Sequence, residues 1–444
     1  MQRDFKKAAP IAAFLEGAGE SPSLASKERV PPESSHKEDI MSKTQLGVIF
    51  GSRTCEHEVA IISAVQLMRN VNREKYDVIP VYISQKGEWF TGGPLLDIKS
   101  YTPFDPYKKG ILPVHLDLTA GSGALLHYVP AKGLFGGGKE EVVARLDCVI
   151  PVMHGLHGED GSLQGLLELA GLPYTSTGVT GSAVGMDKIT MKRFFRGCGF
   201  PILPDCAMTR SEFEKNADAA MNAVEAALPY PVFVKPACLG SSIGVSRADG
   251  REKLREALEL AFSYDRRVLI EQGLDKPIEV NCSVLGFDGE RRASVLEMPN
   301  SGAAFLDFSE KYLAGSGGSK GMASLKRIVP APIGEELTKE LQDLSLRIFD
   351  AMDCKGVVRI DYMLDRHSDN YYITEINTIP GSLAYYLWQE SGLPYAGLID
   401  EMVNCAMQAY KEKERNSFAF SSDILSGVQL GGAKGGKMGG KLKL

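Results

Sequence analysis

Apolar residues occur in short runs along the first part of the chain, and a stretch with helical spacing separates two of them. Residues 46–50, 76–83 and 148–153 are the apolar runs, and such runs predict buried parallel strands. Residues 58–71, between the first two runs, carry apolar side chains close to every third or fourth position. A strand–helix–strand opening of this kind predicts a doubly wound α/β domain.

The pattern further along the chain predicts strands and helices in mixed order. Residues 231–235, 268–271, 357–364 and 371–376 have the composition of strands, and the last two form an adjacent pair. Helices are predicted from residue 162 to 170, from 188 until Pro201 and Pro204 end it, from 335 to 353 and from 396 to 414. The glycine-rich residues 121–139 predict an exposed connection.

Both ends of the chain lack the apolar residues that a core needs. Residues 1–43 are rich in Ser, Pro, Glu and Lys, which predicts a disordered leader. Residues 416–444 end in a stretch of glycines and lysines, which predicts a flexible tail.

Composition restricts the classes of function. The 444 residues are 44% apolar and 24% charged, with a net charge of −6, so there is no basic excess for nucleic-acid binding. No apolar run reaches the roughly 18 residues that cross a bilayer. The eight cysteines are scattered and contain no CxxC pair, which is typical of reduced thiols. Without an export signal, we expect a cytoplasmic location.

The first candidate for chemistry is Lys235, at the end of a predicted strand, and the loop of glycines and serines at residues 240–244. Small residues let backbone N–H groups approach phosphate oxygens, and the lysine adds a positive charge. No GKS or GKT follows, so the loop is not a Walker A motif. An ordinary hairpin explains this segment equally well when it is taken alone.

The second candidate is a set of polar residues on the adjacent strand pair. Alternate residues of a strand share a face, so Arg359 lies beside Asp361, and Glu375 lies beside Asn377. Three converging side-chain oxygens are typical of a magnesium site that phosphate and water complete. The alternative is a strand pair whose charges face solvent.

The third candidate is the loop 155–161 (GLHGEDG), which follows a predicted strand and precedes a helix. Ligands bind at the carboxyl ends of strands in α/β sheets. A helix-capping turn would explain Asp160 but not the neighbouring glycines and histidine.

Together these segments resemble the D-alanine–D-alanine ligases of the ATP-grasp superfamily. The resemblance extends from about residue 46 to 410 and rests on eight ordered blocks. The blocks are residues 51–59 (GSRTCEHEV), 153–165 (MHGLHGEDGSLQG), 172–188 (ending GMDK), 235–245, 271–279, 307–313 (DFSEKYL), 359–361 and 375–381 (EINTIPG).

The resemblance implies an α/β fold of the three-domain ATP-grasp type, with nucleotide between the second and third domains. The implied division is a leader (1–43), an N-terminal doubly wound α/β domain (44–150), a central ATP-grasp subdomain (151–248), a C-terminal ATP-grasp subdomain (249–415) and a tail (416–444).

The resemblance also implies residue roles. ATP would contact Lys188, Lys235, Glu271, the backbone of Leu274, Glu279 and Lys311. Two magnesium ions, for which Mn²⁺ could substitute, would bind Asp361, Glu375 and Asn377. Catalysis would use Glu56, Ser241, Tyr312 and Arg359, and the amino-acid substrates would contact His154, Tyr386 and Leu387.

The implied reaction has two steps. The carboxylate of a first D-alanine attacks the γ-phosphate of ATP, and the amine of a second D-alanine then displaces phosphate from the acyl phosphate. The product would serve peptidoglycan precursor synthesis. The expected partners are therefore amino acids and ATP, without nucleic acid or membrane, and a homodimer is compatible with them.

Other functions are weighed against this one. A related ligase could join a D-amino acid to a different amine or hydroxy acid. A catalytically silent nucleotide-binding regulator would not need Arg359 together with both metal carboxylates. A Rossmann dehydrogenase is excluded because no GxGxxG follows the first strand.

One segment departs from the family pattern. Residues 381–388 (GSLAYYLW) stand where family members usually carry a serine-rich stretch that ends in proline. Tyr386 occupies the position of the serine that binds the acceptor carboxylate. The ring could place its phenol on that carboxylate, or it could narrow the pocket.

Overall fold

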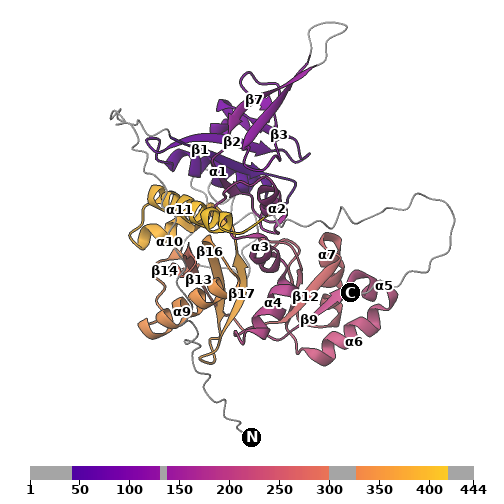
Figure 1. The fold of residues 1–444 in the computed structure, drawn as a ribbon. Helices are drawn as coiled ribbons and strands as arrows, with labels where there is room; N and C mark the ends of the chain where they lie inside the picture. The colour runs from indigo at the N-terminus through magenta and orange to yellow at the C-terminus, as the bar shows by residue number, and fades with distance from the viewer. Residues whose placement is uncertain (1–42, 131–137, 300–326, 419–444) are drawn as a thin grey trace, which may run out of the picture. The chain divides into compact units, whose positions relative to one another are not determined.

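The computed structural model describes residues 43–130, 138–299 and 327–418, which form four β-sheets flanked by helices (Figure 1). The predicted mixed α/β class is confirmed. Lys311 and Tyr312 lie outside the described residues, as do most of the predicted leader and tail. Within the described ranges, no helix has the length and apolar character needed to cross a membrane.

The first sheet has the strand order β4-β3-β2-β1-β8. Its strands are β1 (Thr44–Gly51), β2 (Tyr76–Ile83), β3 (Trp89–Thr91), β4 (Leu112–Pro113) and β8 (Cys148–Val152). β1 pairs in parallel with both β2 and β8, as the strand–helix–strand pattern predicts. The helix between the first two strands is α1 (His57–Asn70), whose apolar side chains are buried.

The interpretation of residues 121–139 as an exposed connection is wrong for residues 124–129, and residues 131–137 lie outside the described ranges. Ala124–Val129 form β6, which pairs with β7 (Lys139–Arg145) and β5 (His115–Leu116) in a small antiparallel sheet. Leu125 of β6 is fully buried, so this short apolar run has a core to join. The surrounding glycines obscured it.

The second sheet has the order β11-β10-β12-β9 and is antiparallel. Its strands are β9 (Asp205–Thr209), β10 (Val232–Pro236), β11 (Ser246–Ala248) and β12 (Arg267–Gln272). The helices in this part of the chain are α2 (Ser162–Leu169), α3 (Val179–Met186), α4 (Lys188–Gly197), α5 (Arg210–Lys215), α6 (Ala217–Ala227) and α7 (Arg251–Tyr264). Val232, Val234 and Ile270 bury their side chains in a core shared with α6 and α7.

The third sheet has the order β15-β14-β13-β16-β17. Its strands are β13 (Ile278–Phe287), β14 (Glu290–Pro299), β15 (Arg327–Ile328), β16 (Gly356–Leu364) and β17 (Tyr371–Asn377). Along β16, Val358, Ile360 and Tyr362 are buried in one core with apolar residues of α9 (Glu335–Ala351). The alternate side chains of β16 therefore point to the opposite, polar face.

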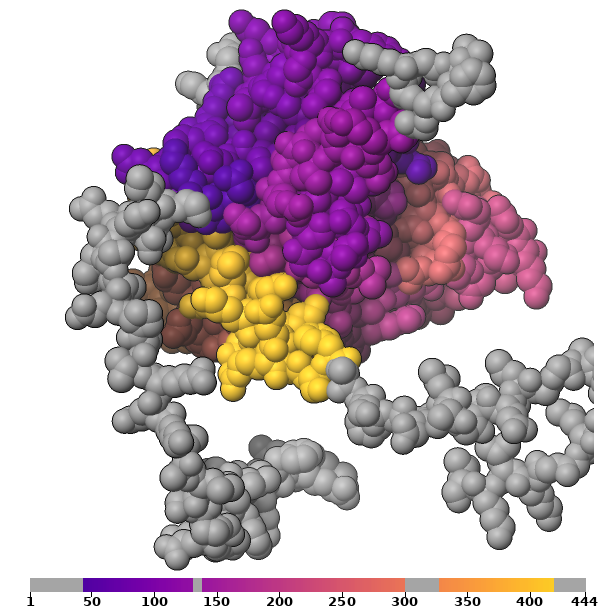
Figure 2. Space-filling model, turned by 45° about the horizontal axis from the view of Figure 1, so that its top comes forward, coloured from indigo at the N-terminus to yellow at the C-terminus, as the bar shows by residue number. Residues whose placement is uncertain are grey.

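The last described helices pack against the first sheet. After η4 (Gly381–Ala384) and α10 (Tyr385–Glu390), α11 (Tyr395–Glu414) buries Leu398, Met402 and Ala406 in the same core as Leu46 of β1 and Ile150 of β8. Figure 2 shows yellow residues of the C-terminal segment next to purple ones from the first half of the chain. The first described strand and the last described helix thus share one core.

Candidate active site

The polar face of the third sheet carries a row of side chains across four strands. Register places Glu297 of β14 opposite Asn281 of β13, Asn281 opposite Asp361 of β16, and Asp361 opposite Glu375 of β17. Side chains opposite one another on adjacent strands share a face, with Cβ atoms about 5 Å apart. Arg359 and Asn377 are likewise opposite each other. The strand pair therefore brings together all four residues that alternation predicted.

Arg359 and Asp361 form a two-point ion pair. The guanidinium Nε donates to Oδ1 of Asp361 at 2.6 Å and Nη2 donates to Oδ2 at 2.7 Å. The Asn377 amide donates to the same Oδ2 at 3.1 Å. Burial raises the pKa of Asp361 to about 6, although the neighbouring guanidinium acts to lower it. The side chains of Arg359 and Asp361 are both largely buried. The alternative, in which these charges face solvent, is therefore wrong.

Lys188 contacts both the polar row and the segment just before the glycine–serine loop at residues 240–244. Its ammonium group donates to the backbone carbonyl of Leu239 at 2.7 Å and lies 3.7 Å from Oε2 of Glu375. Lys188 is the first residue of α4, and Asp187 caps that helix by accepting from the backbone N–H of Thr190. The cap therefore fixes the backbone from which Lys188 extends.

The donor set fits a hard divalent cation that brings its own further ligands. Asp361 and Glu375 supply carboxylate oxygens, and Asn377 can supply an amide oxygen. Within the described ranges no group of three or more His, Cys, Asp or Glu could hold a metal ion by itself. A site with so few protein oxygens is the kind that Mg²⁺ occupies together with substrate phosphates and water.

A buried lysine–glutamate–lysine cluster lies on the second sheet. Lys235 Nζ is 2.5 Å from Glu271 Oε2, and Lys192 of α4 pairs with Oε1 of the same carboxylate. Burial acts to raise the pKa of Glu271, but the two lysines lower it to about 2. Two ammonium groups and one carboxylate leave a net charge of +1, which favours an anion nearby.

The segment after Lys235 has the backbone conformation of a tight loop. Ser241, Ser242 and Gly244 all have positive φ angles of 52°, 60° and 71°, which non-glycine residues adopt infrequently. Strained backbone of this kind is concentrated at ligand-binding sites. The segment is also a hairpin, because β10 pairs antiparallel with β11, and residues 237–245 form the loop between them. The hairpin and a phosphate-binding loop are therefore compatible.

Glu56 lies between two glycines and is held by Ser241. The Ser241 hydroxyl donates to Oε1 of Glu56, which is 6% exposed. A Cβ at Gly155, where φ is 72°, would lie 2.3 Å from Oε2 of Glu56, and one at Gly240 would lie 2.9 Å from it. The carboxylate thus occupies space that only glycine leaves open in these two loops.

His154 lies at the end of β8 and links three segments. Its Nδ1 lies 2.9 Å from the Ile379 carbonyl and must donate to it, so Nε2 accepts from the Ser63 hydroxyl at 2.9 Å. Ser63 in turn accepts from the backbone N–H of Ser382 at 3.2 Å. Burial lowers the pKa of His154 to about 4, so the imidazole is neutral near pH 7.

The predicted adenine and ribose contacts lie where β12 leads into β13. Leu274 is in the turn between them, and Glu279 is the second residue of β13, opposite Met363. Both are partly buried. Glu279 has the same strand phase as Asn281, so its side chain is on the polar face.

Tyr386 and Leu387 are buried at the start of α10. The Tyr386 hydroxyl donates to Oε1 of Glu297 at 2.8 Å, and Leu387 packs with Ala384 and Val295. Tyr386 is thereby attached to the same polar row as the metal-site candidates.

Several residues of this region were not singled out in the sequence. Glu159 accepts from the backbone N–H groups of Gly155 and Ile379, at 2.9 and 2.8 Å. Burial and the nearby Glu56 raise the pKa of Glu159 to about 8. Lys192 lies one helical turn after Lys188, so the sequence could have placed it on the same face of the helix. Asn281 and Glu297 could be assigned to the site only from the strand register.

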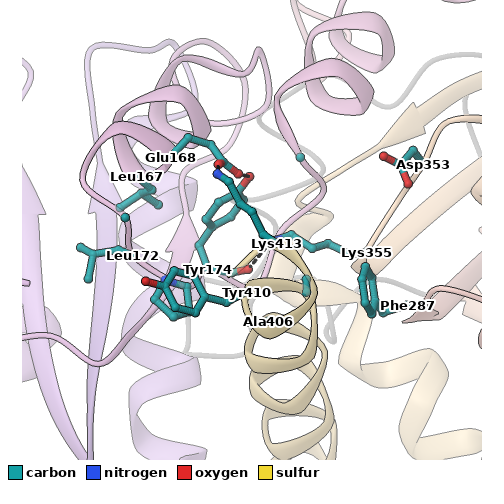
Figure 3. Close-up of a pocket in the computed structure, with 14 residues that line it drawn as sticks. Leu167, Glu168, Leu172, Tyr174, Phe287, Asp353, Lys355, Ala406, Tyr410 and Lys413 are labelled. Carbon is teal, nitrogen blue, oxygen red and sulfur yellow. Dashed lines mark hydrogen bonds and ion pairs between the residues drawn. The ribbon is translucent and has the colours of Figure 1, made fainter. Parts of the chain in front are cut away.

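The structure also has a pocket lined by residues of α2, of the segment that follows it and of α11 (Figure 3). Its lining includes Tyr174, Lys355 and, from α11, Tyr410 and Lys413. The Lys355 ammonium group donates to the Tyr174 carbonyl at 2.9 Å and lies 3.6 Å from the centre of its ring. Of the predicted active-site residues that the structure describes, none lines this pocket.

Comparison with known proteins identifies the family. Residues 45–177 match the model described as D-ala D-ala ligase N-terminus, and residues 194–404 match D-ala D-ala ligase C-terminus. The chain is 35% identical over 387 residues to the D-alanine–D-alanine ligase of Natranaerobius thermophilus, covering 86% of this chain and 100% of that protein. It is 37% identical to the ligase of Acetivibrio thermocellus, covering 83% of this chain and 97% of that protein.

Solved structures have the same fold. The D-Ala:D-Ser ligase VanG of Enterococcus faecalis superposes with a TM-score of 0.68 at 29% identity, covering 82% of this chain and all of that one. The D-alanine–D-alanine ligase of Coxiella burnetii has a TM-score of 0.67 at 24% identity, covering 84% and 96%, which supports the fold alone. The ATP-grasp fold predicted from the sequence is confirmed, and the chain belongs to the D-alanine–D-alanine ligase family.

Proposed function

We propose that this protein joins two D-alanine molecules at the expense of ATP, forming D-alanyl-D-alanine for peptidoglycan precursor synthesis. The observation that carries the proposal is the position of Lys188. Its ammonium group contacts both the segment before the glycine–serine loop and Glu375 of the polar row. A lysine between a phosphate-binding loop and metal-binding carboxylates is placed to hold a transferring phosphoryl group.

The chain's own residues bind and orient the reactants. Lys188 and Lys235 would attract the phosphates of ATP, and Glu271, Leu274 and Glu279 would hold its adenosine. Glu56, fixed by Ser241, would pair with the ammonium group of the first amino acid. His154 is neutral and both of its ring nitrogens are bonded within the protein, so it would position the segments around the first amino acid's carboxylate without donating to it. Arg359 would stabilise negative charge that develops at the carbonyl under attack.

Asp361, Glu375 and Asn377 would hold magnesium. When bound, the metal neutralises charge on the phosphate oxygens and on the attacking carboxylate. Arg359 donates to both oxygens of Asp361, and Asn377 also donates to Oδ2. Since each carboxylate oxygen has two lone pairs, Oδ1 keeps one through which magnesium could bind. We propose that two magnesium ions bind here and that Mn²⁺ can substitute for them.

Three further assignments are part of the proposal. Lys311 and Tyr312 would belong to a segment that closes over the γ-phosphate and keeps water from the acyl phosphate. The division of the chain at residues 43, 150, 248 and 415 is kept as proposed. A cytoplasmic location and a homodimeric assembly agree with the activity.

The test is an assay of the purified protein with ATP, Mg²⁺ and a panel of D- and L-amino acids, with products identified by mass spectrometry. We expect ADP, phosphate and D-alanyl-D-alanine in equal amounts. Glu375→Gln is the matched variant, and it should reduce turnover at least about a hundredfold because an amide cannot neutralise metal charge. Near-parental ligation by Glu375→Gln would refute the metal assignment, and ADP formation without any dipeptide would refute the activity.

A further inference from the structure

A closed polar cluster lies at the β14 end of the row described above. Its members are Glu297, Asn281, Arg327 and Tyr386, called here the Glu297 cluster. Glu297 accepts from Tyr386 Oη at 2.8 Å, from Asn281 Nδ2 at 2.9 Å and from Arg327 Nη1 at 2.9 Å. The carboxylate is 2% exposed. Three donors therefore compensate its buried charge.

Tyr386 is fixed in two ways by this cluster. Its hydroxyl is bonded to Glu297, and the Arg327 guanidinium lies 3.7 Å from the centre of its ring. Arg327 is itself paired with Glu297. A ring held by a hydrogen bond at its edge and a cation over its face has little freedom to rotate.

The direction of the hydrogen bond decides between the two roles considered for Tyr386. A phenol has one proton to donate, and Glu297 receives it. The remaining lone pairs of the oxygen would repel a substrate carboxylate. In this arrangement the ring is a wall and the phenol is not a carboxylate ligand.

The wall stands beside the reacting centre. Asn281 is opposite Glu297 on one neighbouring strand and opposite Asp361 on the other. Adjacent strands are about 5 Å apart. Arg359, two residues before Asp361 on the same face, interacts electrostatically with both Tyr386 and Glu297. A second substrate that approaches Arg359 therefore approaches the Tyr386 ring.

We propose that Glu297 and Arg327 are positioning residues that hold the Tyr386 ring as one wall of the acceptor subsite, and that this wall limits the acceptor to a small side chain. The inference rests on the proposed ligase activity and adds to it the residues that set acceptor size. Arg359 and the metal site remain the groups that act on the reacting atoms.

Three substitutions distinguish the effect of the Tyr386 ring from the effect of the groups that hold it. Tyr386→Ala removes the wall, Tyr386→Phe keeps the ring but removes its bond to Glu297, and Glu297→Gln removes the charge that holds both partners. Each variant is incubated with ATP, Mg²⁺ and D-alanine in competition with D-2-aminobutyrate, D-valine or D-phenylalanine. Tandem mass spectrometry of the dipeptides reads the donor at the N-terminal position and the acceptor at the C-terminal position.

In Tyr386→Ala we expect the ratio of dipeptides with a bulkier acceptor to dipeptides with D-alanine as acceptor to rise at least about tenfold. This is the size of effect that a change in pocket volume has on enzyme selectivity. Tyr386→Phe and Glu297→Gln should give smaller gains in the same direction. Combining these two should add little, because both weaken the same hydrogen bond. The donor position should remain D-alanine in every variant.

The same sheet offers matched controls. Tyr371 Oη donates to Glu340 at 2.6 Å on an exposed surface, so Tyr371→Phe and Glu340→Gln make the same chemical changes away from the cluster. Neither should alter the residue at either position. Melting temperatures of all variants identify any that fail to fold, and Tyr386→Phe, the mildest change, keeps the test decisive if Glu297→Gln is unstable.

The possible results separate the inference from the proposed function. Folded variants that keep the parental acceptor selectivity, or that change donor and acceptor positions equally, would overturn the role of the Glu297 cluster while leaving the ligase activity in place. A parent protein that forms no dipeptide with any acceptor would overturn the proposed function itself.

Discussion

At the scale of single residues, His154 shows how burial fixes a protonation state. Its two ring nitrogens are bonded to the Ile379 carbonyl and the Ser63 hydroxyl, so the neutral tautomer satisfies both. A second proton would place a charge in a buried site near the positive charge of Arg359. The residue therefore joins β8, α1 and the segment after β17 only while it is neutral.

This predicts that His154 destabilises the protein as the pH falls. Its folded pKa is lowered from 6.5 to about 4, so between these values the unfolded chain binds the proton more tightly. Stability is then full above about pH 6.5 and decreases as the pH falls towards about 4. From about pH 7 to about pH 5 the loss due to His154 is about 2 kcal/mol.

Urea unfolding of the parent and of His154→Gln at these two pH values measures the effect. The variant is less stable than the parent at pH 7, but its stability should depend less on pH by about that amount. An identical pH dependence in the two proteins would show that His154 does not titrate between its folded and unfolded states in this range.

The residue types at the site were readable from the sequence, but their pairings were not. Strand alternation placed Arg359 beside Asp361, and Glu375 beside Asn377, as the structure has them. That Arg359 would occupy both oxygens of Asp361 depends on distances that no spacing rule supplies. The link from Tyr386 to Glu297 joins residues 89 positions apart, so it depends on tertiary packing.

At the scale of elements, glycines in two loops make room for one carboxylate. Gly155 follows β8 and Gly240 follows β10, and side chains at either position would meet Glu56. Gly155 also has a φ angle of 72°, which other residues adopt at a cost. The loops therefore determine where Glu56 can lie.

Gly155→Ala is predicted to weaken binding of the first amino acid, because its Cβ would displace the Glu56 carboxylate from Ser241. The positive φ should also lower the free energy of unfolding by about 1 kcal/mol. Gly165→Ala is the control, since α2 leaves that position open with no heavy atom within 4 Å. It should stabilise the protein by about 0.5–1 kcal/mol without affecting the donor KM. Equal effects of the two substitutions on the donor KM would contradict the placement of Glu56.

Element types were predicted well where the pattern was long and regular. Three long helices begin and end within two residues of their predicted bounds: α1, α9 and α11. Amphipathic spacing that continues over many residues is compatible only with a helix. β6 was missed, because six residues flanked by glycines give a weak local pattern. Only its pairing with β5 and β7 makes it a strand.

At the scale of the whole described chain, the site is assembled from segments far apart in sequence. Glu56 follows β1, Lys188 begins α4, Lys235 is the last residue but one of β10, and Asp361 lies on β16. Contacts such as Ser241 to Glu56 and Lys188 to Glu375 cross between these segments. A site built in this way binds its reactants only when the segments meet, which suits a reaction that must exclude water.

The central claim is that the carboxylate of the first D-alanine attacks ATP and that an amine then displaces phosphate. D-alanine labelled with oxygen-18 in its carboxylate, incubated with the protein, ATP and Mg²⁺, tests it most directly. One labelled oxygen should appear in the inorganic phosphate for each dipeptide formed, because the oxygen that attacks phosphorus leaves with it. Phosphate without the label, alongside formation of ADP, would mean that water attacks ATP and would contradict the account.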